Sequence, residues 1–305
     1  MKMAIQRFFR RCKRKLTVVA DSLYSHSWVA WLGLVNRFRR SQVTAPGGPV
    51  VSLTTYGKRI RTVHCTIESI AKGRMLPSRL ILWLDDTDAF ANLPEPLRRL
   101  QRRGLDIRLA KNYGPHTKYY PYLEREDAFA TPLVIADDDN LYPNFWLKAL
   151  VEAFNEFPEF VNCHRARVIA VNETGLGKYA DWRLCSSTDP SFRHLATGVS
   201  GVIYSPPFLA VLKRAGRGFE ACCPKADDLW LHVQALRAGL KVRQIGPQAL
   251  GFSIIPGTQD MALACLNATY GDGNDQQAKT TYGSEDIDVL RRETAGLGQG
   301  APIRG

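Results

Sequence analysis

Three consecutive carboxylates, Asp137, Asp138 and Asp139, follow the apolar run PLVIA at 132–136. A short apolar run that ends on charged residues predicts a buried strand with its polar end at the edge of a sheet. Burial of adjacent acids is costly unless a cation or strong donors compensate. On an extended backbone the outer two carboxylates point to one side and can share a divalent ion. Oxygen ligands favour Mg²⁺ or Mn²⁺, which keep open positions for substrate phosphates. The alternative is a solvated acidic turn.

Two other predicted strands also end on polar residues. Thr54 and Thr55 end the first strand and are followed by Tyr56. Asp85 follows the second strand, and Lys118 lies in the later segment GPHTKYY. A carboxylate can accept a hydrogen bond from a uracil-like base, a lysine can lie against a diphosphate, and a metal can bridge both phosphates. Because GxGxxG and GxxxxGK[ST] are both absent from the first strand–helix turn, a cation is expected to hold the phosphates.

The elements that must position these residues alternate along the chain. Strand patterns cover 50–55, 80–84, 105–109 and 132–136, and helical patterns cover 62–72, 94–103 and 122–129. This order predicts an α/β fold with a mostly parallel sheet flanked by helices on both faces. Further helices are expected at 144–154, 208–214 and 229–238, strands at 167–171 and 242–245, and a glycine-bearing loop leading into a strand over 197–204.

The net charge of +12 is concentrated in an N-terminal basic amphipathic arm. Residues 1–45 contain ten Lys and Arg and one acid, Asp21, and therefore carry +9. The apolar stretch 16–38 is interrupted by Asp21 and by Ser and His residues, which argues against a signal peptide and a transmembrane span. A basic segment that carries tryptophans suits an anionic membrane surface, which residues 1–40 are expected to bind. A disordered arm, or a helix packed on the domain, is the alternative.

Composition also sets the expected boundaries and location. The stretch APGGP at 45–49 separates the arm and linker, 1–45, from one catalytic domain, 46–295, and the polar residues 296–305 form a flexible tail. Seven scattered cysteines without a CxxC pair indicate a reducing compartment. The expected location is the cytoplasm, with peripheral attachment to the inner face of the membrane.

These segments together resemble a nucleotide-sugar glycosyltransferase of the GT-A fold, and most of all bacterial family 2-like enzymes that build surface polysaccharide. The resemblance covers roughly residues 50–280 and includes a DxD motif within the acidic run. It rests on Val50–Tyr56, Leu80–Asp86, the Lys118 turn, Val134–Asp139, Thr197–Tyr204 and the sequence DDLW at 227–230.

The resemblance implies roles for individual residues. Asp137 would face the ribose, with Asp138 beside it, Asp139 would hold the metal, and Asp85 would lie near the base. The loop from Gly198 to Gly201 would lie near the transferred sugar, where small residues let the backbone approach closely. The segment 274–276 is the candidate to close over the site. The implied partners are a nucleotide-sugar donor, with UDP preferred, and a saccharide or lipid-linked acceptor.

The pair Asp227 and Asp228 is similar to the acidic pair that supplies the catalytic base in such enzymes. Direct displacement by an acceptor hydroxyl needs a carboxylate opposite the leaving diphosphate, apart from the metal ligands. We assign Asp228 as the base of an inverting reaction and Asp227 as the helix cap or acceptor ligand. A simpler interpretation is that an acid at this position only caps the following helix, and we expect this to be true of one of the two.

Two other classes of protein compete with this interpretation. A haloacid dehalogenase-type phosphatase also uses Asp-x-Asp at a strand end, but on the first strand and with Thr or Val two residues later, where this chain has Leu141. A nucleic-acid-binding protein would explain the basic arm but leaves the carboxylates at the strand ends unexplained, so no nucleic-acid partner is expected. Hydrolysis of a nucleotide-sugar without transfer remains open.

Overall fold

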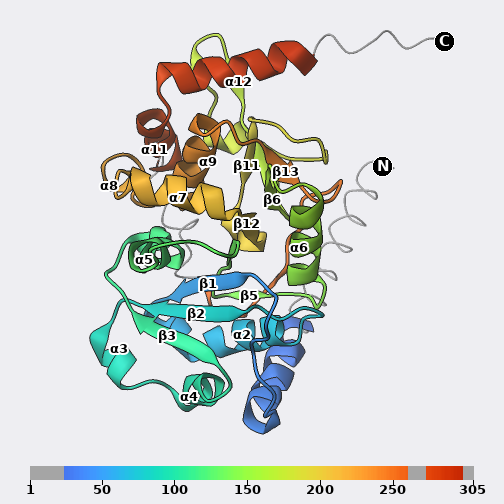
Figure 1. Ribbon diagram of the computed structural model, residues 1–305, viewed down its shortest axis with the longest axis vertical. Coiled ribbons are helices and arrows are strands. Elements are labelled where there is room, and N and C mark those ends of the chain that lie inside the picture. Colours follow the sequence, from blue (N-terminus) through green and yellow to red (C-terminus); the bar gives the residue numbers. More distant parts are fainter. Residues whose placement is uncertain (1–23, 260–272, 298–305) are drawn as a thin grey trace, which may run out of the picture.

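The computed structural model describes residues 24–259 and 273–297 and is built around a seven-stranded sheet (Figure 1). The strand order is β13-β6-β12-β4-β1-β2-β3. In this sheet β12 runs antiparallel to both of its neighbours, and the other pairs are parallel. The predicted mostly parallel sheet is therefore confirmed. Its strands are β1 (Val50–Thr55), β2 (Arg79–Leu84), β3 (Leu105–Leu109), β4 (Leu133–Ile135), β6 (Val161–Cys163), β12 (Val202–Tyr204) and β13 (Val242–Gln244).

Helices cover both faces of the sheet, as the sequence predicts. Alternate side chains along a strand enter different apolar layers, so Ile81 and Ile135 lie in one layer and Leu82 and Val134 in the other. The first layer is closed by α5 (Tyr120–Arg125), α7 (Pro206–Ala215) and α9 (Asp227–Arg237). The second is closed by α2 (Val63–Ala71), α4 (Glu95–Gln101) and α6 (Trp146–Glu156).

Two predicted elements differ most from those in the structure, and the others differ by one or two residues at their ends. The helix expected at 122–129 is α5, which ends at Arg125 because Glu126 has an extended backbone and pairs with Arg79 at 2.7 Å. The strand expected at 167–171 is divided into β7 (Ala166–Val168) and β8 (Val171–Asn172). The two parts pair with different strands: β7 pairs with β10 (Arg183–Leu184) and β11 (His194–Ala196), and β8 pairs with β9 (Gly175–Leu176).

Residues 24–38 form a helix that packs on the domain, shown in dark blue at the lower end of Figure 1. Its Asn36 donates to Glu68 Oε1 of α2 at 3.0 Å. Its Leu32 is fully buried, in a cluster with Cys65, Leu141 and Ile255. For residues 24–38, the structure therefore shows the alternative of a helix packed on the domain. Residues 1–23 lie outside the described ranges. None of the helices within those ranges is long and apolar enough to cross a membrane.

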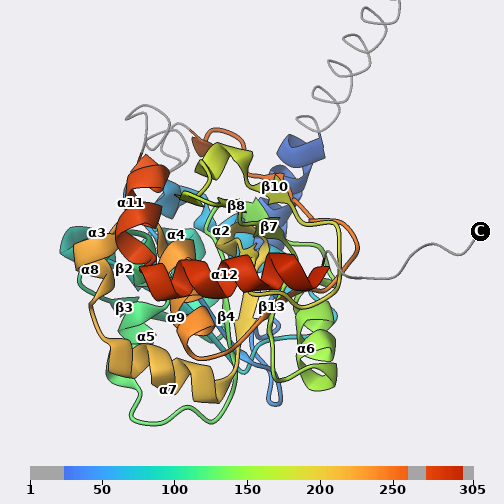
Figure 2. The same ribbon diagram turned by 90° about the horizontal axis from the view of Figure 1, so that it is seen from above.

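The C-terminal helices lie on the outside of the half of the molecule that contains α9. Figure 2 shows α12 (Ser284–Leu297) lying across this side, with α11 (Gly273–Thr281) beside α8 (Phe219–Cys222). Arg237 of α9 pairs with Asp286 of α12 at 2.8 Å. Shorter elements complete the chain: α3 (Thr87–Ala91), β5 (Asn140–Leu141), β14 (Ser253–Ile254) and the 3₁₀ turns η1 (Gly57–Arg61), η2 (Gly114–Lys118), η3 (Tyr179–Asp181) and η4 (Gly198–Ser200).

Candidate active site

The acidic residues lie in a turn that joins β4 to β5 at the carboxyl edge of the sheet. Two hydrogen bonds hold the backbone of the turn: Thr66 Oγ1 donates to Asp138 O at 2.8 Å, and Ile255 N donates to Asp139 O at 2.7 Å. Strand β4 ends at Ile135, and residues 138 and 139 form a turn. The alternation expected for a strand therefore does not apply, and Asp137 and Asp139 bond to different cations of the protein.

Arg59 neutralises the second half of the turn. Its Nη1 lies 2.8 Å from Asp138 Oδ1, and its Nη2 lies 3.2 Å from Asp139 Oδ2. Thr55 Oγ1 also donates to Asp138 Oδ2 at 2.6 Å, and Arg59 is held in turn by two hydrogen bonds to Thr258 O. All of these carboxyl groups are buried, so the ion pairs compensate a desolvation cost that would otherwise be large.

Lys118 neutralises the first half of the turn and connects it to α9. Its Nζ lies 2.6 Å from Asp137 Oδ1 and 3.2 Å from Asp227 Oδ2. Side chains of β1 and β2 fix the backbone of this lysine. Ser52 Oγ donates to Lys118 O at 2.6 Å, and Trp83 Nε1 donates to Ser52 Oγ at 2.8 Å. Buried polar groups of the sheet thus place the ammonium group between two carboxylates that are ninety residues apart in the sequence.

Asp227 and Asp228 occupy the first turn of α9, where the helix dipole favours negative charge. The N-cap is Ala226, and no side chain caps the helix, so the predicted capping role is wrong. Asp228 Oδ1 accepts a hydrogen bond from Gly198 N at 2.9 Å. Burial, and next the charge of Asp227, raise the pKa of Asp228 to about 7, while Lys118 and the Gly198 N–H act in the opposite direction.

Asp227 has one incompletely satisfied oxygen. Its buried Oδ2 is close enough to Lys118 for an ion pair but is not aligned for a hydrogen bond, and it has no other hydrogen-bond partner among the described residues. Buried carboxylate oxygens are normally bonded, so this atom is suited to receive a donor group from a ligand.

The predicted glycines have different environments. A Cβ at Gly198 would lie 3.3 Å from Asp228 Oδ1 and 3.4 Å from Lys118 Nζ, so this residue lines the cluster. Gly201 has φ of 95°, and a Cβ there would lie 2.5 Å from the indole nitrogen of Trp146. Its lack of a side chain therefore serves packing against α6 rather than the acidic cluster.

The predicted nucleotide residues at the other strand ends are only partly assembled. Thr54 Oγ1 donates to Trp83 O at 3.2 Å within the sheet, away from Asp138, which Thr55 contacts. Tyr56 precedes η1, and the guanidinium carbon of Arg59 lies 5.6 Å from the centre of its ring. Asp85 follows β2, next to the end of β1, and burial raises the pKa of its carboxyl group.

The segment 274–276, predicted to close over the site, begins α11. Asp275 Oδ1 accepts a hydrogen bond from Tyr179 N at 2.6 Å, and α11 also contacts α8 and α9.

Sequence reasoning missed Arg59 and Gln259. Gln259 Nε2 donates to Asp139 Oδ2 at 3.1 Å. The position of Arg59 shortly after β1 could have indicated a contact with the acidic turn, because parallel strands place their carboxyl ends at one edge of the sheet. The role of Gln259 has no such signal, since it depends on a contact across 120 positions of the chain.

The site contains five carboxylates and two cations that bond to them, which leaves an excess of negative charge suited to a divalent ion. Burial, and next Asp137 and Asp138, raise the pKa of Asp139 to about 7. In the described part of the chain no three His, Cys, Asp or Glu residues converge as a metal site, because the carboxylates point to Arg59 and Lys118. Carboxylate oxygens such as those of Asp137 and Asp139 are the type of ligand that Mn²⁺ and Mg²⁺ prefer.

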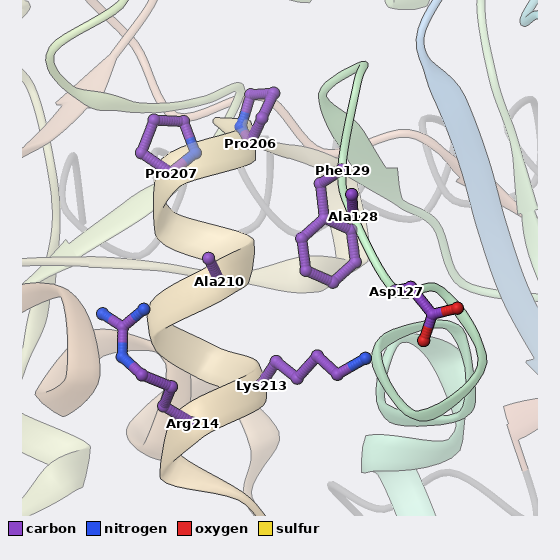
Figure 3. A pocket seen from close by; sticks show the side chains of 8 residues that line it. All are labelled: Asp127, Ala128, Phe129, Pro206, Pro207, Ala210, Lys213 and Arg214. Carbon is purple, nitrogen blue, oxygen red and sulfur yellow. The ribbon is translucent and has the colours of Figure 1, made fainter.

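A hollow of about 650 Å³ lies elsewhere, between α7 and the loop after α5 (Figure 3). Phe129 and Ala210 face each other across it, and Pro206 stands at one end. Tyr204, two residues before Pro206, pairs with Leu133 at the start of β4. The hollow is therefore at the edge of the sheet opposite the acidic turn and is not the candidate active site.

Comparison with known proteins supports the fold. No protein-family model and no curated protein matches the chain. The mannosyltransferase PcManGT from Pyrobaculum calidifontis, solved with GDP-Man and Mn²⁺, is similar in structure with a TM-score of 0.51 and 12% identity over 93% of this chain and 87% of that one. This match shows a shared α/β fold of the GT-A, Rossmann-like type.

Two further matches are weaker. S. aureus TarS 1–349 has a TM-score of 0.40 and 14% identity, covering 67% of this chain and 58% of that chain. A CMP:2-keto-3-deoxy-manno-octonic acid synthetase complexed with CTP has a TM-score of 0.41 and 12% identity, covering 73% and 99%.

We predict that Arg59→Met destabilises the protein by about 3 kcal/mol at pH 8, because it leaves buried carboxylates unpaired. The folded-state pKa of Asp139 is above its ordinary value of 3.8, so the folded protein retains a proton that the unfolded chain has lost, and stability falls as pH rises towards 7. Arg59 lowers the pKa of Asp139, so its removal raises this pKa further and makes stability depend more strongly on pH. The stability lost in Arg59→Met should therefore be smaller at pH 5.5 than at pH 8. Urea unfolding at both pH values measures it, with exposed Lys58→Met as the control. Equal losses at the two pH values would contradict the ion-pair role.

Proposed function

We propose that this protein is a metal-dependent hexosyltransferase that moves a sugar from a nucleotide-sugar, with UDP preferred, to a saccharide or lipid-linked acceptor in surface polysaccharide synthesis. The observation that carries the proposal is the arrangement around Lys118. One ammonium group lies between Asp137 of the acidic turn and Asp227 of α9, which supports a diphosphate site at the turn with a separate carboxylate pair beside it. The fold shared with a mannosyltransferase is consistent with this chemistry.

On the donor side, Asp139 and Asp137 would hold Mn²⁺ or Mg²⁺, which supplies charge neutralisation for the departing diphosphate when bound. Lys118 is already buried beside this position and can turn from Asp137 to a phosphate oxygen. Arg59 would keep Asp138 neutralised both with and without the donor bound, since it bonds to the carboxylate that Thr55 also holds. Tyr56 and Asp85 at the neighbouring strand ends would face the nucleoside.

On the acceptor side, Asp228 would take the proton of the attacking hydroxyl. A base is most effective when its pKa lies near the working pH, and burial raises the pKa of this carboxyl group to about 7. The hydrogen bond from Gly198 N fixes one oxygen and leaves the other available. Attack from the side of α9, opposite the diphosphate, gives inversion of the anomeric configuration. Asp227, with its unbonded Oδ2, would bind the acceptor.

The test of this function is turnover of a panel of UDP-, GDP- and CMP-sugars with Mn²⁺, with and without saccharide acceptors. We expect release of UDP that depends on the acceptor and is lost in excess EDTA. The Asp139→Asn variant should lose activity by orders of magnitude and keep its fold, whereas exposed Asp288→Asn should match the wild type. Full activity in EDTA would contradict the metal assignment, and nucleotide release without transfer would indicate a hydrolase.

We predict that Asp228→Asn lowers turnover by about 10²- to 10⁴-fold, the usual contribution of a general base, and leaves UDP and Mn²⁺ binding nearly unchanged. In the wild type the rate should rise with pH through about 7, because the ionised carboxylate is the active form. The measurements are a pH–rate profile, calorimetric binding of UDP, and the anomeric configuration of the product. Retention of configuration, or a normal rate in Asp228→Asn beside an inactive Asp227→Asn, would refute the assignment.

A further inference from the structure

The helix of residues 24–38 has one face packed on the domain and one exposed apolar face. One face packs on the domain through Leu32, which is fully buried, with Ser25 and Asn36 on the same side. The other face carries four large side chains at spacings of seven, three and four residues, which places them together along one side of a helix. These are Tyr24, Trp31, Leu34 and Phe38, here called the outward face.

The outward face is unusually exposed. Its four side chains are 53%, 40%, 56% and 67% exposed, in sequence order. They are half of the eight large apolar side chains exposed in residues 24–259 and 273–297, and the other four are spread over separate elements. A cluster of this kind, unlike scattered single residues, indicates a binding surface.

Cations surround the outward face. Lys72 Nζ lies 3.7 Å from the centre of the Trp31 ring, and the guanidinium carbon of Arg37 lies 5.8 Å from the centre of the Phe38 ring. Arg40 is exposed just beyond the helix, and no acidic residue occurs between positions 24 and 40. Seven further Lys and Arg, without an acid, occupy residues 1–15. Aromatic and aliphatic side chains flanked by cations match the boundary between head groups and acyl chains in an anionic bilayer.

We propose that the outward face is the surface by which this protein docks on an anionic membrane, with Trp31, Leu34 and Phe38 entering the interface and the flanking cations contacting lipid head groups. A second copy of the chain is disfavoured as the occupant, because association through this face would bring two sets of cations together. Docking does not depend on glycosyl transfer.

The proposal also relates the membrane to the candidate active site. The buried side of the helix contacts Leu141 of β5 and Ile255, which follows β14. Ile255 N donates to Asp139 O, so the helix and the acidic turn share one pair of strands. If the proposed function holds, docking would bring the site to the surface on which a lipid-linked acceptor lies.

The test is co-sedimentation of the full chain with phosphatidylcholine vesicles that do or do not contain phosphatidylglycerol, in the absence of nucleotide and metal. We expect binding to the anionic vesicles, weakened by high salt. The double variant Leu34→Gln with Phe38→Gln should reduce binding by at least about tenfold, without a change in thermal unfolding. The matched control is Phe90→Gln with Leu184→Gln, which removes two exposed apolar side chains elsewhere and should bind as the wild type does.

A second measurement locates Trp31. Brominated lipids should quench the tryptophan fluorescence of the wild type more than that of Trp31→Phe, because the Trp31 ring lies at the depth of the bromine atoms. The proposal is overturned if the wild type does not bind anionic vesicles, or if the Leu34 and Phe38 variant binds equally well. It is also overturned if light scattering shows a dimer that this variant dissociates, since the outward face would then join two copies.

Discussion

The compensation of buried negative charge at the end of β4 is the interaction on which the rest of this structure depends. Of the three adjacent carboxylates there, Asp138 and Asp139 are buried and Asp137 is half-buried, and each is bonded to a cation that comes from another part of the chain. Arg59 follows β1, and Lys118 precedes α5. Without these two residues the turn would have to protonate or unfold, because isolated buried charges are not tolerated. The same two residues contact the turn at which we propose that a diphosphate and its metal bind.

The sheet positions these cations through ordinary packing. Strand β1 places Thr55 beside Asp138, and the bond from Trp83 through Ser52 to the backbone of Lys118 passes between neighbouring strands. The helix α9 then approaches from the opposite side and closes the cluster through Asp227. These buried contacts fix the backbone of Lys118 and the carboxyl group of Asp138.

Much of this arrangement follows from local patterns in the sequence. The apolar runs that end on Thr55, Asp85 and Asp137 predicted the strands and their shared edge, and the alternation of elements predicted the parallel sheet. Contacts between distant segments could not be predicted in the same way. The turn at residues 138–139 separates carboxylates that an extended strand would align, and Gln259 reaches this turn only through the folded chain.

We propose that the acidic turn holds a divalent ion together with a nucleotide diphosphate. This can be tested by anomalous diffraction from crystals grown with UDP and Mn²⁺. We expect one strong manganese peak about 2.2 Å from a carboxylate oxygen of Asp139, in contact with both phosphates, with Lys118 turned towards the diphosphate. A diphosphate bound without manganese at Asp139, or a manganese peak at another part of the surface, would contradict it.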